Sequence, residues 1–507
     1  MTNKVISFDV FDTALLRKVY KPSDIFKLIE KKVGNDFYNK RIEAQARAAE
    51  EDPFCTIEDI YNYLPEFDMN VEIEIEMDNC YANPELYAAY NEKDFIFISD
   101  MYLPSSVIKA MLEKAGYKNP QVFVSCEEKA WKADGTLFEK VQETGYEITK
   151  HMGDNYVADI LGAKKAGIEN VYFVPALHNK KLNLPALRNP VLKKFIALTE
   201  DSFMTPVEKL AFFVAPIMVG FTKWVLSKRK PGQKIFFLAR DMYIPYLIAQ
   251  RWGASDIYYL HASRRSMAGV CLRSDNEELK KRVKEFLPEE DVEEKRSNAA
   301  EAIKYLKSMH LKKGDIIVDI GYAGTIQAAI ESALDIKLQG LHLQKYQDSP
   351  LLKDMNVEQF FERNAIHFAM IAEFPFCSPE NCVELYKNKK PIFKPDVEKR
   401  KEFSKHIVDL IMNIFLDMPV AQEEISVFDL EQLFIQLQYY PSDGMMKVYN
   451  EHIFANKESV ESIINFSIER IKRGELLDLY DKSYCKPLFC RMLSQIEDYA
   501  HLTELLK

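Results

Sequence analysis

At 507 residues the chain is too long for a single hydrophobic core, and its length predicts two or three domains. Its formal net charge of −10 and the lack of a basic stripe argue against nucleic acid as a main partner. Eight cysteines without any Cys-x-x-Cys pair indicate neither a zinc site nor a disulfide framework, so free thiols in a reducing cytoplasm are the simplest interpretation.

The first chemical motif lies at the start of the chain. Residues 6–16 predict an apolar strand that carries Asp9 into a turn, where open α/β sheets bind ligands. Thr13, four residues later, can hold that turn or a phosphate oxygen. Because this motif begins so early, we expect no signal peptide and a cytoplasmic protein.

Three later segments carry the next candidate residues. Residues 95–101 predict a second apolar strand ending in Ser99, and residues 132–138 offer Lys132 at the opening of a helix. Residues 153–159 then offer the paired acids Asp154 and Asp159. About eighty residues of helical pattern separate the first two motifs. A strand at 170–174 and a linker at 175–190 end this part of the chain.

In this order and spacing, the four motifs resemble the haloacid dehalogenase superfamily of aspartate-nucleophile hydrolases and phosphatases. The resemblance covers roughly residues 1–180 and implies a domain of residues 1–190 whose helical cap spans about 17–92. It further implies Asp9 as nucleophile, Ser99 and Lys132 holding the transferred phosphoryl group, and a Mg²⁺ site formed by Asp9, Phe11, Asp154 and Asp159. A hard, oxygen-ligated cation, a lysine and hydroxyl donors would mask the charge of the phosphoryl group during attack.

One position departs from the pattern of these phosphatases. They usually carry an acid/base aspartate two residues after the nucleophile, and this chain has Phe11 there, with Asp12 one residue further. Dehalogenase-like members also lack that aspartate. The alternatives are that Asp12 substitutes, that another group does, or that turnover is slow.

The second half of the chain predicts another α/β unit, over residues 200–395. An apolar helix at 205–228 is short for a membrane span and contains Pro216, Gly220 and Lys223, so a buried helix is the preferred interpretation. Strands follow at 234–241, 256–266 and 315–320 and alternate with helices, which predicts a parallel sheet. Residues 396–507 are predicted to be mainly helical.

Charged residues and glycines follow these strands. Gly321, Gly324 and Thr325 form a strand-to-helix turn that can cradle an anion, because glycines let backbone N–H groups approach a phosphate. Asp319 suits ribose hydroxyls. The other charged candidates for substrate binding are Arg240, Asp241, Arg264 and Arg265, and the three arginines could hold a pyrophosphate. This pattern resembles phosphoribosyltransferases, although Ile320 replaces the usual second acid.

Two alternatives stay open for this turn. Residues 318–321 also resemble the first glycine loop of S-adenosylmethionine methyltransferases, but that loop needs a Gly-x-Gly step and should follow the first strand of its domain. The turn could instead be purely structural, with the arginines paired to acids such as Glu373 or Glu384.

The whole arrangement resembles proteins of bacterial capsule and surface-polysaccharide clusters that add ribofuranose from phosphoribosyl pyrophosphate. It implies phosphoribosyl transfer to a glycan acceptor, followed by Mg²⁺-dependent removal of the 5-phosphate by the first domain. The alternative is a sugar-phosphate phosphatase whose second domain only binds or recruits. The sequence gives no basis for naming the acceptor or an oligomeric state.

Overall fold

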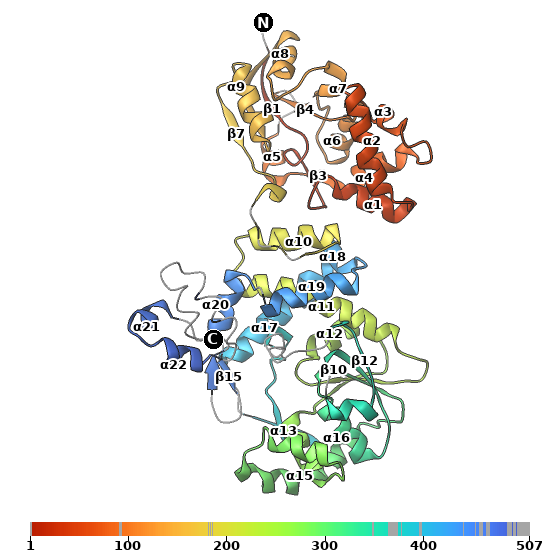
Figure 1. Ribbon diagram of the computed structural model, residues 1–507, viewed down its shortest axis with the longest axis vertical. Coiled ribbons are helices and arrows are strands. Elements are labelled where there is room, and N and C mark those ends of the chain that lie inside the picture. The colour runs from red at the N-terminus through yellow and green to blue at the C-terminus, as the bar shows by residue number, and fades with distance from the viewer. Residues whose placement is uncertain are drawn as a thin grey trace. The chain divides into compact units, whose positions relative to one another are not determined.

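The chain forms two compact units. One contains Met1–Leu184 and Pro190–Asp201, and the other contains Pro185–Asn189 and Ser202–Lys507. The predicted α/β class is confirmed, because each unit holds a five-stranded parallel sheet with helices between its strands (Figure 1). This computed structural model describes residues 3–90, 94–180, 182, 184, 186–346, 349–363, 374–376, 378–394, 398–439, 441–451, 453–455, 460–462, 467–483, 489 and 493.

The first unit is built on a sheet of strand order β5-β4-β1-β6-β7, all parallel. Every residue of the interior strand β4 is buried, as expected for a parallel strand covered on both faces. The strands are β1 (Asn3–Phe8), β4 (Phe95–Ser99), β5 (Val122–Val124), β6 (Tyr146–Gly153) and β7 (Val171–Phe173).

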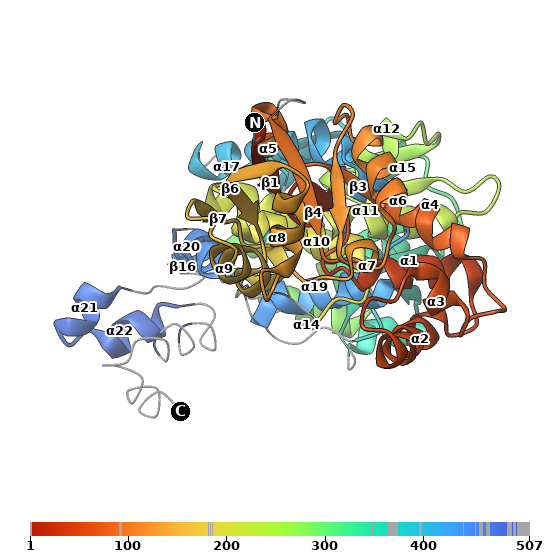
Figure 2. The same cartoon turned by 90° about the horizontal axis from the view of Figure 1, so that it is seen from above.

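A helical insertion separates β1 from β4. A short antiparallel pair, β2 (Leu15–Arg17) and β3 (Cys80–Ala82), brackets it. The insertion contains α1 (Asp24–Val33), α2 (Phe37–Glu51), α3 (Ile57–Tyr61) and α4 (Met69–Asn79), and α5 (Pro84–Ala89) follows β3. Helices α1 to α4 gather to one side of the sheet in both views (Figures 1 and 2).

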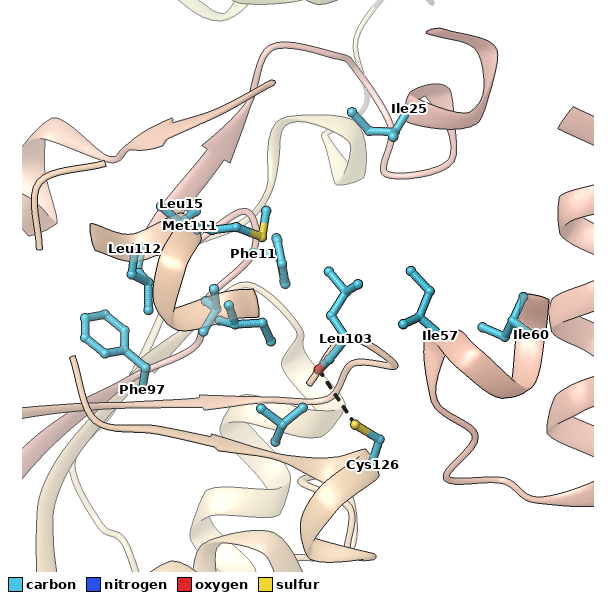
Figure 3. Packing of buried hydrophobic residues seen from close by; sticks show 14 of the residues in the cluster. Phe11, Leu15, Ile25, Ile57, Ile60, Phe97, Leu103, Met111, Leu112 and Cys126 are labelled. Atoms are coloured by element: carbon cyan, nitrogen blue, oxygen red, sulfur yellow. Dashed lines mark hydrogen bonds between the residues drawn. The ribbon is translucent and has the colours of Figure 1, made fainter. Parts of the chain in front are cut away.

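One apolar core joins this insertion to the sheet. Ile57 and Ile60 of α3 belong to the same buried cluster as Phe97 of β4 (Figure 3). Within the insertion, Arg41 of α2 donates to both carboxylate oxygens of Glu72 of α4, at 2.6 and 2.8 Å. Loss of one member of such a buried pair costs about 3–5 kcal/mol, so this pair fixes α2 against α4.

The remaining helices of the first unit follow its strands. The strands expected at 95–101 and 170–174 correspond to β4 and β7. The helix expected to open at Lys132 is α8, which begins four residues later at Thr136, because Gly135 occupies the left-handed region at φ 94°. The elements are α6 (Ser105–Lys114), α7 (Ser125–Glu128), α8 (Thr136–Glu143), η1 (Tyr156–Gly162), α9 (Ala163–Lys165), η2 (Leu177–Asn179) and α10 (Pro190–Asp201).

The second unit is built on a sheet of strand order β12-β11-β10-β8-β9, again all parallel. Its strands are β8 (Ile235–Leu238), β9 (Ile257–Leu260), β10 (Ile316–Tyr322), β11 (Gln339–Lys345) and β12 (Asn356–Gln359). Its connecting segments are α12 (Tyr243–Arg251), α13 (Arg264–Arg273), α14 (Glu277–Lys284), η3 (Glu289–Asp291), α15 (Val292–Ser308), α16 (Thr325–Leu334), η4 (Pro350–Asp354) and η6 (Phe374–Phe376). A hairpin of β13 (Val383–Lys387) and β14 (Lys390–Phe393) follows.

Helix α11 (Pro206–Ser227) is the apolar helix expected at 205–228. It begins at a capping box in which Thr205 and Glu208 exchange hydrogen bonds. Among the described residues it is the one helix whose length and composition would allow a membrane crossing, and 72% of its most apolar window is buried inside the protein. This burial supports the interpretation of α11 as a core helix.

The described residues after 396 are mainly helical and belong to the second unit. They form α17 (Glu398–Asn413), η7 (Phe415–Asp417), α18 (Pro419–Gln422), α19 (Val427–Tyr439) and α20 (Asp443–Glu451), then the pair β15 (Ile453–Ala455) and β16 (Val460–Ser462), and finally α21 (Ile468–Lys472) and α22 (Leu476–Asp481).

Candidate functional site

Three neighbouring strands bring the first set of predicted residues to one edge of the sheet. Asp9 follows β1, Ser99 ends β4 and Asp154 follows β6. Strands β4, β1 and β6 are adjacent and parallel, so their carboxyl ends meet at the same edge. Asp9 and Ser99 are both buried there.

Lys132 lies between two of the carboxylates. Its Nζ is 2.5 Å from Asp9 Oδ1 and 2.6 Å from Asp159 Oδ1, and its side chain is buried. Burial lowers the pKa of Lys132, but the carboxylates of Asp159, Asp9 and Asp100 outweigh burial and raise it. The ammonium therefore stays charged at neutral pH. Asp100, which sequence analysis did not single out, accepts the backbone N–H of Lys132 at 3.1 Å.

The carboxylates outnumber this lysine. Asp9, Asp154 and Asp159 each offer an oxygen, and the three atoms lie within 4.8 Å of one another. Burial, and next the negative charge of Asp12, raise the pKa of Asp154 to about 7. Burial also raises the pKa of Asp9, although Lys132 opposes it. Three acids against one ammonium leave negative charge uncompensated, and a hard divalent cation fits such a set of oxygen ligands.

Asp159 is held firmly in this group. Its Oδ2 accepts the backbone N–H of Asn155 at 2.8 Å, and its Oδ1 lies 3.3 Å from Nε2 of the buried His151. Burial opposes ionisation of Asp159, but Lys132 and His151 lower its pKa. Gly153 makes room for this arrangement, since a Cβ there would lie 2.1 Å from Asp159 Cγ.

Asp12 takes part in a different contact. Its backbone has φ 58°, and its Oδ2 accepts a hydrogen bond from Arg17 Nη1 at 2.8 Å. The same guanidinium lies 4.4 Å from the centre of the Phe11 ring and donates to Glu76 of α4 at 3.5 Å. The Arg17 guanidinium therefore lies over the ring of Phe11, and the carboxylate of Asp12 is hydrogen-bonded to the same guanidinium.

Thr13 is fully buried near the same turn. Among the described residues its Oγ1 has no hydrogen-bond partner. A buried hydroxyl without a partner costs free energy unless a ligand or water satisfies it. Thr13 therefore remains a good candidate for contact with a bound oxyanion.

A second set of predicted residues meets at the equivalent edge of the other sheet. Arg240 and Asp241 follow β8, Arg264 and Arg265 follow β9, and Asp319 lies in the middle of β10, level with the end of β8. Strands β10, β8 and β9 are adjacent and parallel. Burial, and then Asp241, raise the pKa of Asp319 to about 7, while the N–H groups of Gly321 and Ile320 and the charge of Arg264 oppose this rise. Asp241 and Arg264 thus interact with Asp319.

Gly321 lies inside strand β10, whereas the sequence places it in the turn; the turn itself is formed by Ala323 and Gly324. Gly321 has φ 111°, and a Cβ there would lie 2.0 Å from the carbonyl oxygen of Gln344. Gly324 has φ 75° and directly precedes Thr325, the first residue of α16. The turn therefore presents a helix N-terminus at the carboxyl edge of the sheet, where anions are favoured.

Arg265 is already engaged by acids. Its Nη2 lies 2.9 Å from Asp291 and its Nε lies 3.0 Å from Glu384. Glu384 also binds Lys295 at 2.5 Å and Lys394 at 3.0 Å. Arg265 is therefore paired with acids, as the purely structural alternative for the turn and its arginines predicts.

Arg264 has a different neighbour, since its guanidinium lies 5.9 Å from the ring centre of Phe286. Glu373, the other acid considered as an arginine partner, lies outside the described residues.

Comparison with known proteins gives neither site a name. No protein family matches the chain, and no curated protein is significantly similar to it. The function of both sites is therefore argued from their residues and geometry alone.

Proposed function

We propose that the first unit is a Mg²⁺-dependent phosphomonoesterase of the haloacid dehalogenase type, with Asp9 as nucleophile. The observation that carries the proposal is the position of Lys132 Nζ, bound to both Asp9 and Asp159 beside a third carboxylate, Asp154. A carboxylate nucleophile, a buried ammonium and an excess of acids are what phosphoryl transfer through an aspartyl-phosphate needs.

In this proposal Asp9, Asp154 and Asp159 would hold Mg²⁺, with Phe11 beside it. The bound ion would neutralise charge on the transferred phosphoryl group. Lys132, Ser99 and Thr13 would donate to the phosphoryl oxygens. The buried, unpartnered hydroxyl of Thr13 supports its assignment.

The reaction would have two steps. Asp9 Oδ forms a bond to phosphorus while the bond to the leaving oxygen breaks, and that oxygen leaves as an alcohol after gaining a proton. Water then attacks the phosphorus of the aspartyl-phosphate, which restores the Asp9 carboxylate and releases inorganic phosphate. Asp12, solvent or another group would supply the proton.

We further propose that the second unit transfers a phosphoribosyl group from phosphoribosyl pyrophosphate to a glycan hydroxyl. The glycines before α16, with Asp319 earlier in β10, support this proposal. The acceptor oxygen would bond to C1 of the ribose as the bond from C1 to pyrophosphate breaks, and the hydroxyl proton would be released.

In this second site, Asp319 would hold the ribose hydroxyls, and Gly321, Gly324 and Thr325 the 5-phosphate. The residues proposed to hold the leaving pyrophosphate are Arg240, Arg264 and Arg265, with Mg²⁺ helping to neutralise its charge. Asp241 is a further candidate for substrate binding at this edge. For Arg265 this role requires exchange of its bonds to Asp291 and Glu384.

Together the two reactions would leave unphosphorylated ribofuranose on a surface polysaccharide, because the phosphatase removes the 5-phosphate. Incubation of the full-length chain with phosphoribosyl pyrophosphate, Mg²⁺ and candidate glycans tests the tandem. We expect pyrophosphate release and a pentose mass added to the acceptor, whereas the Asp9→Asn variant stops at the phosphorylated pentose.

The alternative is that only the first unit is an enzyme and the second binds or recruits. The engagement of Arg265 by Asp291 and Glu384 favours it. A thermal shift separates the two proposals, because a ligand at 100 times its Kd stabilises a protein by about 2.7 kcal/mol. If phosphoribosyl pyrophosphate with Mg²⁺ raises the Tm of the wild-type chain but not that of Gly321→Ala, the transferase proposal stands. No shift in the folded wild-type chain would reject it and leave the phosphatase.

A further inference from the structure

A chain of hydrogen bonds runs from strand β1 through strand β6 to the carboxylate of Asp159. Ser7 and His151 are partners in the register of the two strands, and Ser7 Oγ lies 2.8 Å from His151 Nδ1. The other ring nitrogen, Nε2, lies 3.3 Å from Asp159 Oδ1. All three residues are completely buried, so bulk water does not compete for these contacts.

The partners of the imidazole ring assign its tautomer. The carboxylate of Asp159 binds the ammonium of Lys132 at 2.6 Å and is ionised, so it can only accept hydrogen bonds. Nε2 therefore carries the proton and donates to Asp159 Oδ1. Burial lowers the pKa of His151, although Asp159 opposes this, and in the neutral ring Nδ1 is the acceptor. The hydroxyl of Ser7 lies farther from its alternative acceptor, the carbonyl oxygen of Lys150 at 3.4 Å, and donates to Nδ1.

The ring of His151 is itself held in place. It packs edge-to-face against Phe138 of α8, with the ring centres 4.8 Å apart. His151 and Gly153 are two residues apart in β6, so both lie on one face of the strand, and Asp159 covers Gly153 there. The imidazole is therefore a fixed support beside the carboxylate.

A Ser–His–Asp chain is also the catalytic arrangement of serine hydrolases. That role does not fit here, because Ser7 is 0% exposed inside strand β1 and no ester can reach its hydroxyl. Asp159 is moreover bound to Lys132, which also binds Asp9. The chain of hydrogen bonds thus supports the acids of the first site and does not form a separate active site.

The donors around Asp159 leave part of its carboxylate for a cation. Oδ1 accepts hydrogen bonds from Lys132 and His151, and Oδ2 accepts one from the backbone N–H of Asn155. An ionised carboxylate has about four acceptor positions, so within the described part of the chain one position on Oδ2 stays open. Because Lys132 Nζ is shared with Asp9, loss of the imidazole donor would leave Oδ1 with a partner that Asp9 also attracts.

We propose that His151 is a positioning residue for the divalent cation of the first unit. Its Nε2–H holds the Asp159 carboxylate in the orientation that binds the ion together with Asp9 and Asp154. This inference rests on the proposed phosphatase function and adds a residue outside the ligand set that determines metal affinity. Such outer partners of metal ligands contribute about 10- to 100-fold to metal affinity.

Titration of the full-length protein with Mn²⁺, followed by electron paramagnetic resonance, tests this role. The wild-type chain should bind Mn²⁺, and Asp154→Asn should lose that site. His151→Asn places an amide where Nδ1 lies and leaves Asp159 without its donor, whereas His151→Gln places an amide N–H near the position of Nε2. We expect about 10- to 100-fold weaker Mn²⁺ binding in His151→Asn and near wild-type binding in His151→Gln.

The activity should follow the same order. The Mg²⁺ concentration for half-maximal phosphatase activity should rise in His151→Asn by the same factor as the Mn²⁺ dissociation constant, and an excess of Mg²⁺ should restore most of the activity. Thr149→Val is the control, because Thr149 of β6 donates to the carbonyl oxygen of Val5 at 3.0 Å. This variant removes a hydrogen bond between the same two strands, outside the chain from Ser7 to Asp159, and should keep the wild-type affinity.

If His151→Asn does not fold, His151→Leu, which also lacks the donor, takes its place. Wild-type Mn²⁺ affinity in the variant without the donor, or equal losses in that variant and in His151→Gln, overturns the inference while the phosphatase stands. A folded wild-type chain whose Mn²⁺ binding is unchanged by Asp154→Asn overturns the metal site on which the proposed phosphatase itself depends.

Discussion

The two units place charged side chains at the same edge of similar five-stranded parallel sheets, yet the side chains pair differently. In the first unit Lys132 binds Asp9 and Asp159 and leaves a third acid, Asp154, without a cation. In the second unit Arg265 is bound by two acids of its own domain. Strand topology brings residues to an edge, but local pairing decides whether they can receive a ligand.

This difference has an energetic meaning. Excess acids in a buried site favour binding of a cation, because the ion removes repulsion that folding has already imposed. An arginine that is ion-paired with two acids must give up those pairs before it can bind pyrophosphate, and such exchange costs free energy. The first edge therefore carries acids that a divalent cation could bind without rearrangement, whereas Arg265 at the second edge would have to exchange its partners.

The largest expected effect is the loss of activity on removing the nucleophile. Asp9→Asn should lower phosphate release from a sugar phosphate by about 10⁴-fold or more, as removal of a catalytic nucleophile generally does. Circular dichroism and the Tm should show a folded protein, since the two side chains have nearly the same shape. Any pyrophosphate release by the second unit should be unchanged. Full phosphatase activity in Asp9→Asn would show that Asp9 is not the nucleophile.

The next largest effect is expected from Gly153→Ala, which adds a methyl group where the Asp159 side chain lies. A Cβ at Gly153 would lie 2.1 Å from Asp159 Cγ, so Gly153→Ala must displace the carboxylate that binds Lys132. We expect a loss of about 10²-fold in kcat, because small displacements in an active site cost that much, and a destabilisation of about 1–3 kcal/mol. Steady-state kinetics measures the loss in kcat, and urea unfolding measures the loss in stability.

Gly444→Ala is the matched control for Gly153. Its Cβ would meet nothing closer than 3.8 Å, and Gly444 lies in helix α20. This variant should leave activity unchanged and stability equal or slightly higher, by about 0.4–1 kcal/mol. Equal kinetics for the two alanine variants would contradict the role of Gly153.

Much of the first site could be predicted from the sequence, and the reason is local. Asp9 follows an apolar strand and Ser99 ends another, and parallel strands place such residues at a common edge whatever the rest of the chain does. Asp154 follows β6, whose mainly polar sequence does not predict a strand. Lys132 was expected to open a helix, but Gly135 delays α8 and leaves the lysine in the preceding turn.

The contacts that sequence reasoning missed join segments far apart in the chain. Arg17 reaches Glu76 across the helical insertion, and α10 approaches Tyr20 from a segment expected to lie near the domain boundary. The engagement of Arg265 by Asp291 and Glu384 is of the same kind. No pattern within a strand or a helix carries that information.

A smaller effect is expected at Asp12. Because Arg17 binds its carboxylate, Asp12 is less suited to exchange a proton than a free aspartate would be. Asp12→Asn should therefore lower kcat by less than the 10²–10⁴-fold that loss of general acid/base catalysis costs. The pH profile of kcat should keep its shape. A loss within that range at unchanged Tm would instead identify Asp12 as the acid/base.

The last prediction, a change in stability with pH, concerns the second site. Burial raises the pKa of Asp319 to about 7, above its usual value near 4 in an unfolded chain. Between about pH 4 and 7 the folded state therefore retains a proton that the unfolded state has released, and stability falls as the pH rises through this window. Asp319→Asn removes that dependence.

The Tm of Asp319→Asn relative to the wild-type chain should accordingly increase from pH 4 to 7 and level off above, because the wild-type carboxylate is then fully charged beside Asp241. Asp335→Asn, at an exposed position just after α16, is the control and should follow the wild-type curve. Differential scanning fluorimetry at half-unit pH steps resolves the two curves. If the curves of the wild type and Asp319→Asn ran parallel, Asp319 would be charged throughout this range.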